Sequence, residues 1–119
     1  MITDAKETCT QVPRAEKIAQ MNDMLRKSCR GGAIMLTRDV KSLPGFSPTE
    51  LLRALAAYDS FDPDNDPHGE RDFGDLEVFD ADLLWKIDYY DAEMAYGSND
   101  PADPAQTTRV LTVMLAREY

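Results

Sequence analysis

An acidic segment interrupted by proline and glycine divides the 119-residue chain into two unlike halves. Pro63, Pro67 and Gly69 all fall within residues 62–72, and this spacing excludes a regular helix or strand there. Before the segment, apolar residues recur at the three-to-four-residue interval of a helix. After it, β-branched and aromatic residues gather in short runs that are typical of strands. Such segregation predicts an α+β fold, with the helices on one face of a sheet.

The N-terminal half is expected to hold two helices and one strand, with approximate bounds of 14–30, 48–58 and 33–37 respectively. Gly31 and Gly32 supply the end of the first helix. Cys29 lies on the apolar stripe of that helix, which predicts a buried and unreactive thiol. Ser47 and Glu50 have the spacing of a capping box at the start of the second helix.

The C-terminal half is expected to hold three strands, at 76–79, 83–90 and 107–119, of which the first two form a hairpin that turns at residues 80–82. Trp85, Ile87 and Tyr89 alternate with charged residues and should face the core. Lys86 and Asp88 should pair on the opposite face. The last segment favours a central strand, with a helix as the competing interpretation.

These elements predict one domain over residues 13–119, preceded by a flexible arm at 1–12. Its chain order is α-β-α-β-β-β, and its sheet of about four strands is mainly antiparallel because hairpins connect neighbouring strands. An exposed edge strand leaves the formation of a homo-oligomer open.

The charge of the chain, −9 in all, is concentrated in its second half. Residues 59–103 contain fifteen carboxylates and two cations, Arg71 and Lys86. This excludes direct binding of a nucleic-acid backbone by that region, because such affinity comes from cations that displace counterions. No apolar run reaches the roughly 20 residues of a membrane span, and two cysteines make no disulfide framework, so we expect a cytoplasmic protein that does not enter membranes.

The leading hypothesis is a non-enzymatic protein that binds a partner with a basic surface, such as a nucleic-acid-binding complex, and needs no cofactor. Its carboxylates would compete with nucleic acid for a cationic groove. An outward-facing aromatic residue beside carboxylates can anchor such a contact. The expected contact residues are Asp62, Asp64, Asp66, Glu70, Asp72, Asp75, Asp88, Tyr90 and Asp91.

The alternative is a metal-dependent enzyme of the hydrolase kind that uses the same loop. His68, Glu70 and Asp72 alternate, so an extended segment would place all three on one side, where they could hold a divalent metal with open positions for water. An EF-hand is a poor match, because Arg71 takes the place of the apolar anchor and flanking helices are missing. The competing interpretation is that the acidic side chains cap turns. The candidate metal ligands are Asp64, Asp66, His68, Glu70 and Asp72.

Several separate strings resemble one family of small bacterial proteins, a domain of unknown function that is frequent in alphaproteobacteria and on their plasmids and phages. The strings are Asn22–Arg26, Asn65–Gly74, Trp85–Asp91, Gly97–Pro104 and Thr108–Leu115, within about residues 20–119. The resemblance implies no established activity. Its mobile-element setting makes an inhibitor of host nucleic-acid machinery, of the anti-restriction or anti-CRISPR type, the expected form of the leading hypothesis.

This chain departs from the family's pattern at Arg71, where histidine is usual. A guanidinium stays protonated, so Arg71 is neither a metal ligand nor a general base. It can instead pair with carboxylates and order the loop. The departure favours a protein that is not an enzyme.

Overall fold

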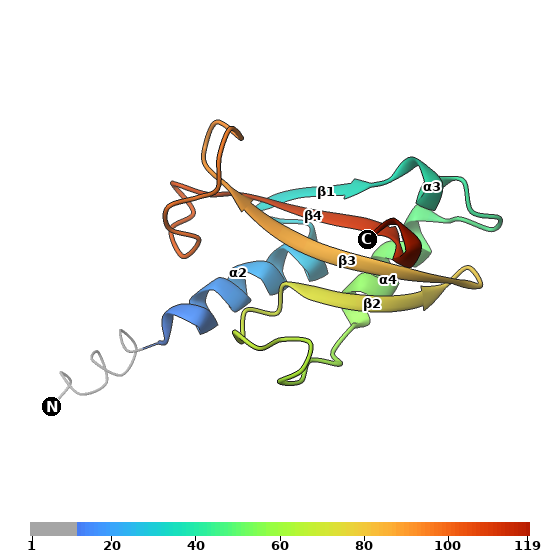
Figure 1. The fold of residues 1–119 in the computed structure, drawn as a ribbon, viewed down its shortest axis with the longest axis horizontal. Coiled ribbons are helices and arrows are strands. Elements are labelled where there is room, and N and C mark those ends of the chain that lie inside the picture. The colour runs from blue at the N-terminus through green and yellow to red at the C-terminus, as the bar shows by residue number, and fades with distance from the viewer. Residues whose placement is uncertain (1–11) are drawn as a thin grey trace, which may run out of the picture.

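Residues 12–119 are described by a computed structural model, so nearly all of the predicted arm at 1–12 lies outside the described residues. The fold is α+β, as predicted (Figure 1). Its elements are α2 Arg14–Ser28, β1 Gly32–Leu36, α3 Arg38–Lys41, α4 Pro48–Ala57, β2 Phe73–Val78, β3 Ala81–Tyr90, β4 Thr108–Leu115 and the 3-10 helix η1 Ala116–Glu118. No helix in residues 12–119 has the length and apolar character needed to cross a membrane.

The four strands form one sheet in the order β1-β4-β3-β2. β3 pairs antiparallel with both β2 and β4, whereas β1 runs parallel to β4, so the sheet is mixed. The prediction of a central C-terminal strand is confirmed, and the competing helix is wrong for Thr108–Leu115. The predicted chain order holds, with the addition of the four-residue helix α3, which is too short to give a periodic signal.

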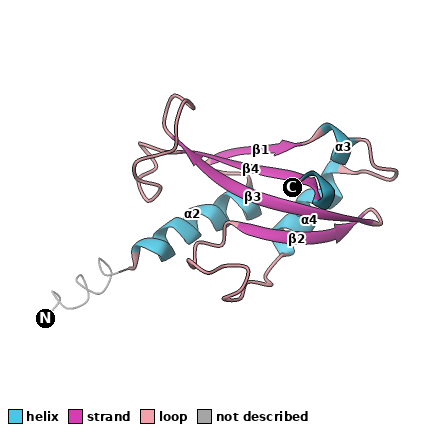
Figure 2. Ribbon diagram, in the orientation of Figure 1, coloured by secondary structure: helices cyan, strands magenta, loops and turns pink. Residues whose placement is uncertain are grey.

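Both long helices lie behind one face of the sheet, and the core fills the space between them (Figure 2). Leu25 of α2 and Leu51 and Leu55 of α4 are buried against Trp85 and Leu111 of the sheet. The predicted start of α4 is confirmed, because the Ser47 hydroxyl accepts a hydrogen bond of 3.3 Å from the Glu50 amide and Pro48 occupies the first turn. The predicted alternation in β3 is confirmed as well, including the Lys86–Asp88 ion pair.

Two local predictions are wrong. Cys29 is exposed, because the helix ends at Ser28 and Cys29 adopts a left-handed φ of 58° that turns it off the apolar stripe. The hairpin turns at Phe79 and Asp80, with φ of 58° and 55°, rather than at residues 80–82. A two-residue turn with two positive φ angles matches the twist of the strands, so β3 begins earlier than predicted.

The other face of the sheet carries no long helix in the described part of the chain. We call it the open face. Strand alternation places Met35, Asp75, Lys86 and Thr112 there. At one end the C-terminal residue packs on it, since the Tyr119 and Phe73 rings lie 5.8 Å apart. Two networks of polar side chains, around Arg71 and around Asn22, lie instead on the helix side of the sheet.

Candidate functional site

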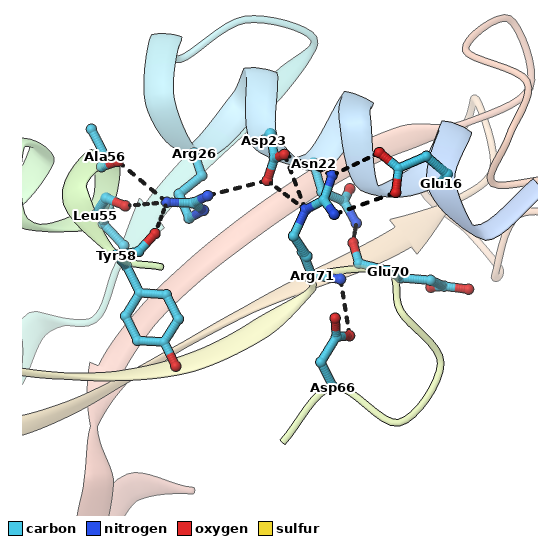
Figure 3. Close-up of polar contacts among 10 residues, drawn as sticks. All are labelled: Glu16, Asn22, Asp23, Arg26, Leu55, Ala56, Tyr58, Asp66, Glu70 and Arg71. Atoms are coloured by element: carbon cyan, nitrogen blue, oxygen red, sulfur yellow. Dashed lines mark hydrogen bonds and ion pairs between the residues drawn. The ribbon is translucent and has the colours of Figure 1, made fainter. Parts of the chain in front are cut away.

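The acidic loop is fixed against α2 by Arg71 (Figure 3). The Arg71 guanidinium donates to Asp23 Oδ2 at 3.0 Å and to Glu16 Oε2 at 3.2 Å, both on α2. At the loop side, the Arg71 amide donates to Asp66 Oδ1 at 3.0 Å. The hydrogen bond from Arg71 holds the pKa of the Glu16 carboxyl below its usual value. Arg71 therefore pairs with carboxylates and orders the loop, as predicted.

Asp23 is shared between two arginines, because it also accepts a hydrogen bond of 3.1 Å from Arg26. Arg26 is only 2% exposed, and its Nη1 donates to the carbonyls of Leu55 at 2.7 Å and Tyr58 at 2.8 Å, where α4 ends (Figure 3). A cation at this position satisfies carbonyls that have no partner within the helix and interacts favourably with the helix dipole. Arg26 thus joins α2 to α4.

A second network runs under the sheet. The Tyr89 hydroxyl donates to Glu70 Oε1 at 2.9 Å and accepts from the Asn22 amide at 2.8 Å. Asn22 Oδ1 accepts in turn from Arg109 Nε at 2.9 Å. Burial raises the pKa of Tyr89 well above its usual value, so the hydroxyl stays protonated and can donate. Asn22 is fully buried and all of its side-chain polar atoms are hydrogen-bonded, so this network joins α2 to the loop and the sheet.

The proposed metal ligands are not assembled into a site. The prediction that His68, Glu70 and Asp72 lie along one side of an extended segment is wrong, because left-handed φ angles of 70° at Gly69 and 54° at Arg71 turn the chain between them. Glu70 is directed to Tyr89, and Asp66 binds the Arg71 amide. Within residues 12–119, no three His, Cys, Asp or Glu side chains are arranged to hold a metal ion.

Asp72 is half-buried in the same loop, and its environment disfavours the ionised form. Burial, with the nearby Glu70 and Asp66 carboxylates, raises the pKa of its carboxyl above 3.8. Ionised Asp72 therefore destabilises the fold at neutral pH, and the wild-type chain loses this penalty as the pH falls through the raised pKa.

We expect Asp72→Asn to have a higher melting temperature than the wild type at pH 7. The difference should shrink as the pH is lowered toward 3.8, where the wild-type carboxyl becomes neutral. Melting curves of both proteins across this range measure it, with Asp64→Asn as the control because Asp64 is exposed in the same loop. A difference that grows toward low pH would contradict the assignment.

The structure divides the nine predicted contact residues among three places. Asp75, Asp88 and Tyr90 lie on the open face. The five loop residues, Asp62, Asp64, Asp66, Glu70 and Asp72, lie between α4 and β2, and the Asp62 carboxylate accepts from the amides of residues 64 and 65 at 2.8 and 3.0 Å. Asp91 accepts two amide hydrogen bonds within its own turn. Several of these side chains therefore do cap turns.

Sequence reasoning missed Asn22, Arg26 and Arg109 as network residues. A signal existed for the first two, because Asn22 and Arg26 follow Ile18 at steps of four and so continue the buried side of α2. Arg109 lies two residues before Leu111, on the core face of a strand. Polar residues at positions that periodicity assigns to the core indicate a buried network.

The two networks join segments that lie far apart in the chain. The residues come from α2 (Asn22, Asp23 and Arg26), the loop (Glu70 and Arg71), β3 (Tyr89) and β4 (Arg109). Comparison with curated proteins found no match, and comparison with solved structures found none. A family model described as "Protein of unknown function (DUF3768)" matches residues 36–118. The chain belongs to this family, DUF3768.

Proposed function

We propose that the chain is a non-enzymatic, cytoplasmic protein-binding module whose open face contacts a basic protein surface. The main support for the proposal is that both cations within residues 59–103 are already paired with carboxylates. Arg71 is paired with Asp23 and Glu16 of α2, and Lys86 is paired with Asp88. Apart from Asp100, which pairs with Arg14, the exposed carboxylates of this region form no ion pair with a cation outside it within residues 12–119. They keep a negative field, and such a field attracts a basic partner.

The open face concentrates part of this charge on the β2–β3 hairpin. Asp75, Glu77 and Asp82 are exposed, and none of them forms an ion pair within residues 12–119. Glu77 lies directly opposite Asp82 in the register of the two strands. Like charges placed opposite one another destabilise a sheet, so the fold by itself gains nothing from this pair. Binding of a cationic partner would turn the same pair into a favourable contact.

An apolar groove on the same face adds the second component of a protein contact. Tyr90, Val110, Met35 and Met94 are among the residues that line a hollow of about 480 Å³. Met35 is 55% exposed and Met94 is 51% exposed. Interfaces combine apolar and charged surface, so the open face fits a protein that presents an apolar side chain together with basic residues.

The finer form of the proposal is an inhibitor of nucleic-acid machinery, of the anti-restriction or anti-CRISPR type. It is supported by the exposed carboxylates of the open face, which would occupy the positions of nucleic-acid phosphates in a cationic groove. The resemblance to proteins carried by plasmids and phages supports the same setting.

A charge-matched pair of variants tests the proposal. We expect Asp75→Asn/Glu77→Gln/Asp82→Asn to lose capture of a partner from a bacterial lysate by at least about tenfold, while Glu50→Gln/Asp59→Asn/Asp64→Asn retains it. Both triples remove three negative charges from exposed side chains, but only the first lies on the open face. Capture by the wild type should also weaken as the salt concentration is raised from about 50 to about 500 mM, because screening acts on exposed charges.

Equal loss in both triples would mean that net charge alone drives the association, and undiminished capture by the open-face triple would place the contact elsewhere. Competition by duplex DNA for the captured partner separately tests whether the protein is an inhibitor of nucleic-acid machinery. If DNA does not compete, the inhibitor proposal fails and the binding module stands.

A further inference from the structure

Arg109 is a buried cation without a counter-ion in the described part of the chain. It is 2% exposed, yet it forms no ion pair with a carboxylate within residues 12–119. Its partners are neutral: Asn22 Oδ1 at 2.9 Å, the Pro101 carbonyl, and the Tyr89 ring, whose centroid lies 5.2 Å from the guanidinium. Buried charges in proteins are normally paired, because removing an ion from water is costly.

Arg26 gives the comparison within the same protein. It is buried to the same extent, but it has Asp23 as a counter-ion at 3.1 Å. Arg109 differs further in one terminal nitrogen, Nη1, for which residues 12–119 provide no hydrogen-bond acceptor. The polar side-chain atoms that are both sealed and unpartnered are Arg26 Nε and Trp85 Nε1, so Arg109 Nη1 is not sealed. Nη1 thus keeps a small accessible surface, although the Arg109 side chain as a whole is buried.

A cavity of about 500 Å³ adjoins Arg109, between α2 and the starts of β1 and β4. Its other lining residues include Met21 and Met24 of α2, Gly32 and Pro104. Gly32 is required for the close contact of β1 with β4, because a Cβ there would lie 2.4 Å from the Arg109 carbonyl oxygen. The cavity is thus a mostly apolar hollow with one cationic group, within the size range of small-ligand sites.

We propose that this cavity binds an organic carboxylate, with the anionic group on Arg109 Nη1 and an apolar body against Met21, Met24 and Pro104. A carboxylate on a guanidinium forms a charge-assisted hydrogen bond, and a buried site strengthens that bond. The site lies beside α2, whereas the proposed protein contact lies on the open face, so each can fail without the other.

The competing explanation is that Glu70 compensates Arg109 at a distance. Glu70, Tyr89, Asn22 and Arg109 are joined by successive hydrogen bonds, so the Glu70 charge is linked to the guanidinium only through two neutral groups. If that link is the whole counter-charge, the cavity has no affinity for anions. The two explanations therefore predict different titrations.

Hexanoate is the probe, titrated into the full chain and followed by NMR chemical shifts of the cavity residues, with hexanol as the uncharged control. We expect saturable binding of hexanoate and none of hexanol. Met24→Glu should weaken binding by about tenfold, because it places a like charge at the cavity. Leu52→Glu should leave it unchanged, since Leu52 is exposed on α4 and does not line the cavity.

Failure of hexanoate to saturate, equal binding of hexanol, or equal weakening by the two glutamate variants would overturn the proposal. Both variants replace exposed side chains, so both should fold, which their melting curves check. A short peptide ending in leucine, with a free or amidated carboxyl end, forms a second arm. Tighter binding of the free peptide than of hexanoate assigns the site to a peptide C-terminus, and the reverse order assigns it to a small metabolite.

Discussion

Arg26→Ala is expected to lower the free energy of unfolding by about 3 kcal/mol, because it removes a buried side chain and its hydrogen bonds, while Asp23 keeps its pairing with Arg71. The substitution removes the Arg26 donor to the carbonyls of Leu55 and Tyr58 where α4 ends, and the Leu55 carbonyl keeps only the Tyr58 amide at 3.3 Å. It also removes a guanidinium that lies 5.4 Å from the Phe61 ring centroid and 5.7 Å from that of Trp85. The docking of α4 on α2 depends on the two carbonyl contacts.

Urea denaturation of Arg26→Ala and Lys27→Ala measures this effect with a matched control. Lys27 is the next residue of α2, is exposed, and forms no ion pair within residues 12–119, so its truncation should change stability by less than about 0.5 kcal/mol. Arg26→Lys should recover only part of the loss, because an ammonium cannot reproduce the planar fork that reaches both carbonyls and Asp23. If Arg26→Ala were as stable as Lys27→Ala, the contacts of Arg26 would not contribute to the stability of the fold.

What the sequence predicts well is local. The alternation of Trp85, Ile87 and Tyr89 specifies one face of β3 because the strand period is fixed by backbone geometry. The Ser47 cap specifies the start of α4 because its hydrogen bond spans three residues. Neither prediction requires knowledge of where the rest of the chain lies.

What the sequence does not predict is the orientation of the acidic loop. Arg71 reaches Asp23, 48 residues earlier in the chain, and its left-handed φ is set by that contact rather than by its own preference. The alternation of His68, Glu70 and Asp72 assumed an extended backbone, and the turns at Gly69 and Arg71 remove that premise. The spacing of candidate ligands in a loop therefore predicts a metal site only when the backbone conformation of the loop is known.

The networks also bear on where function can reside in this family. The polar residues of the two networks hold the loop, the helices and the sheet together. Asn22 and Arg26 are buried, and the Tyr89 hydroxyl is hydrogen-bonded to Glu70. The exposed polar residues that can meet a partner include Asp75 and Glu77 on the open face. Because the buried polar residues stabilise the fold, we propose that the contact surface is formed by exposed residues of the open face.

Asn22→Ala gives the second large effect, an expected loss of about 3 kcal/mol or more in the free energy of unfolding. The amide of Asn22 serves three groups at once: the Glu70 carbonyl at 3.0 Å, the Tyr89 hydroxyl and Arg109 Nε. Removing it leaves these groups buried without that partner, and each buried polar group left unpaired costs about 1–3 kcal/mol. Gln20→Ala is the control, since Gln20 is exposed on the same helix and its one side-chain contact, to Glu16, is 3.4 Å long.

A double-mutant cycle separates the network from simple loss of volume. Tyr89→Phe removes the hydroxyl that joins Glu70 to Asn22 while keeping the ring under the Arg109 guanidinium. If the hydrogen bonds act as one unit, the Asn22→Ala/Tyr89→Phe chain should be more stable than the sum of the single losses predicts, with a coupling energy of about 1–2 kcal/mol. Losses that add without coupling would mean that the Tyr89 hydroxyl and the Asn22 amide stabilise the fold independently of one another.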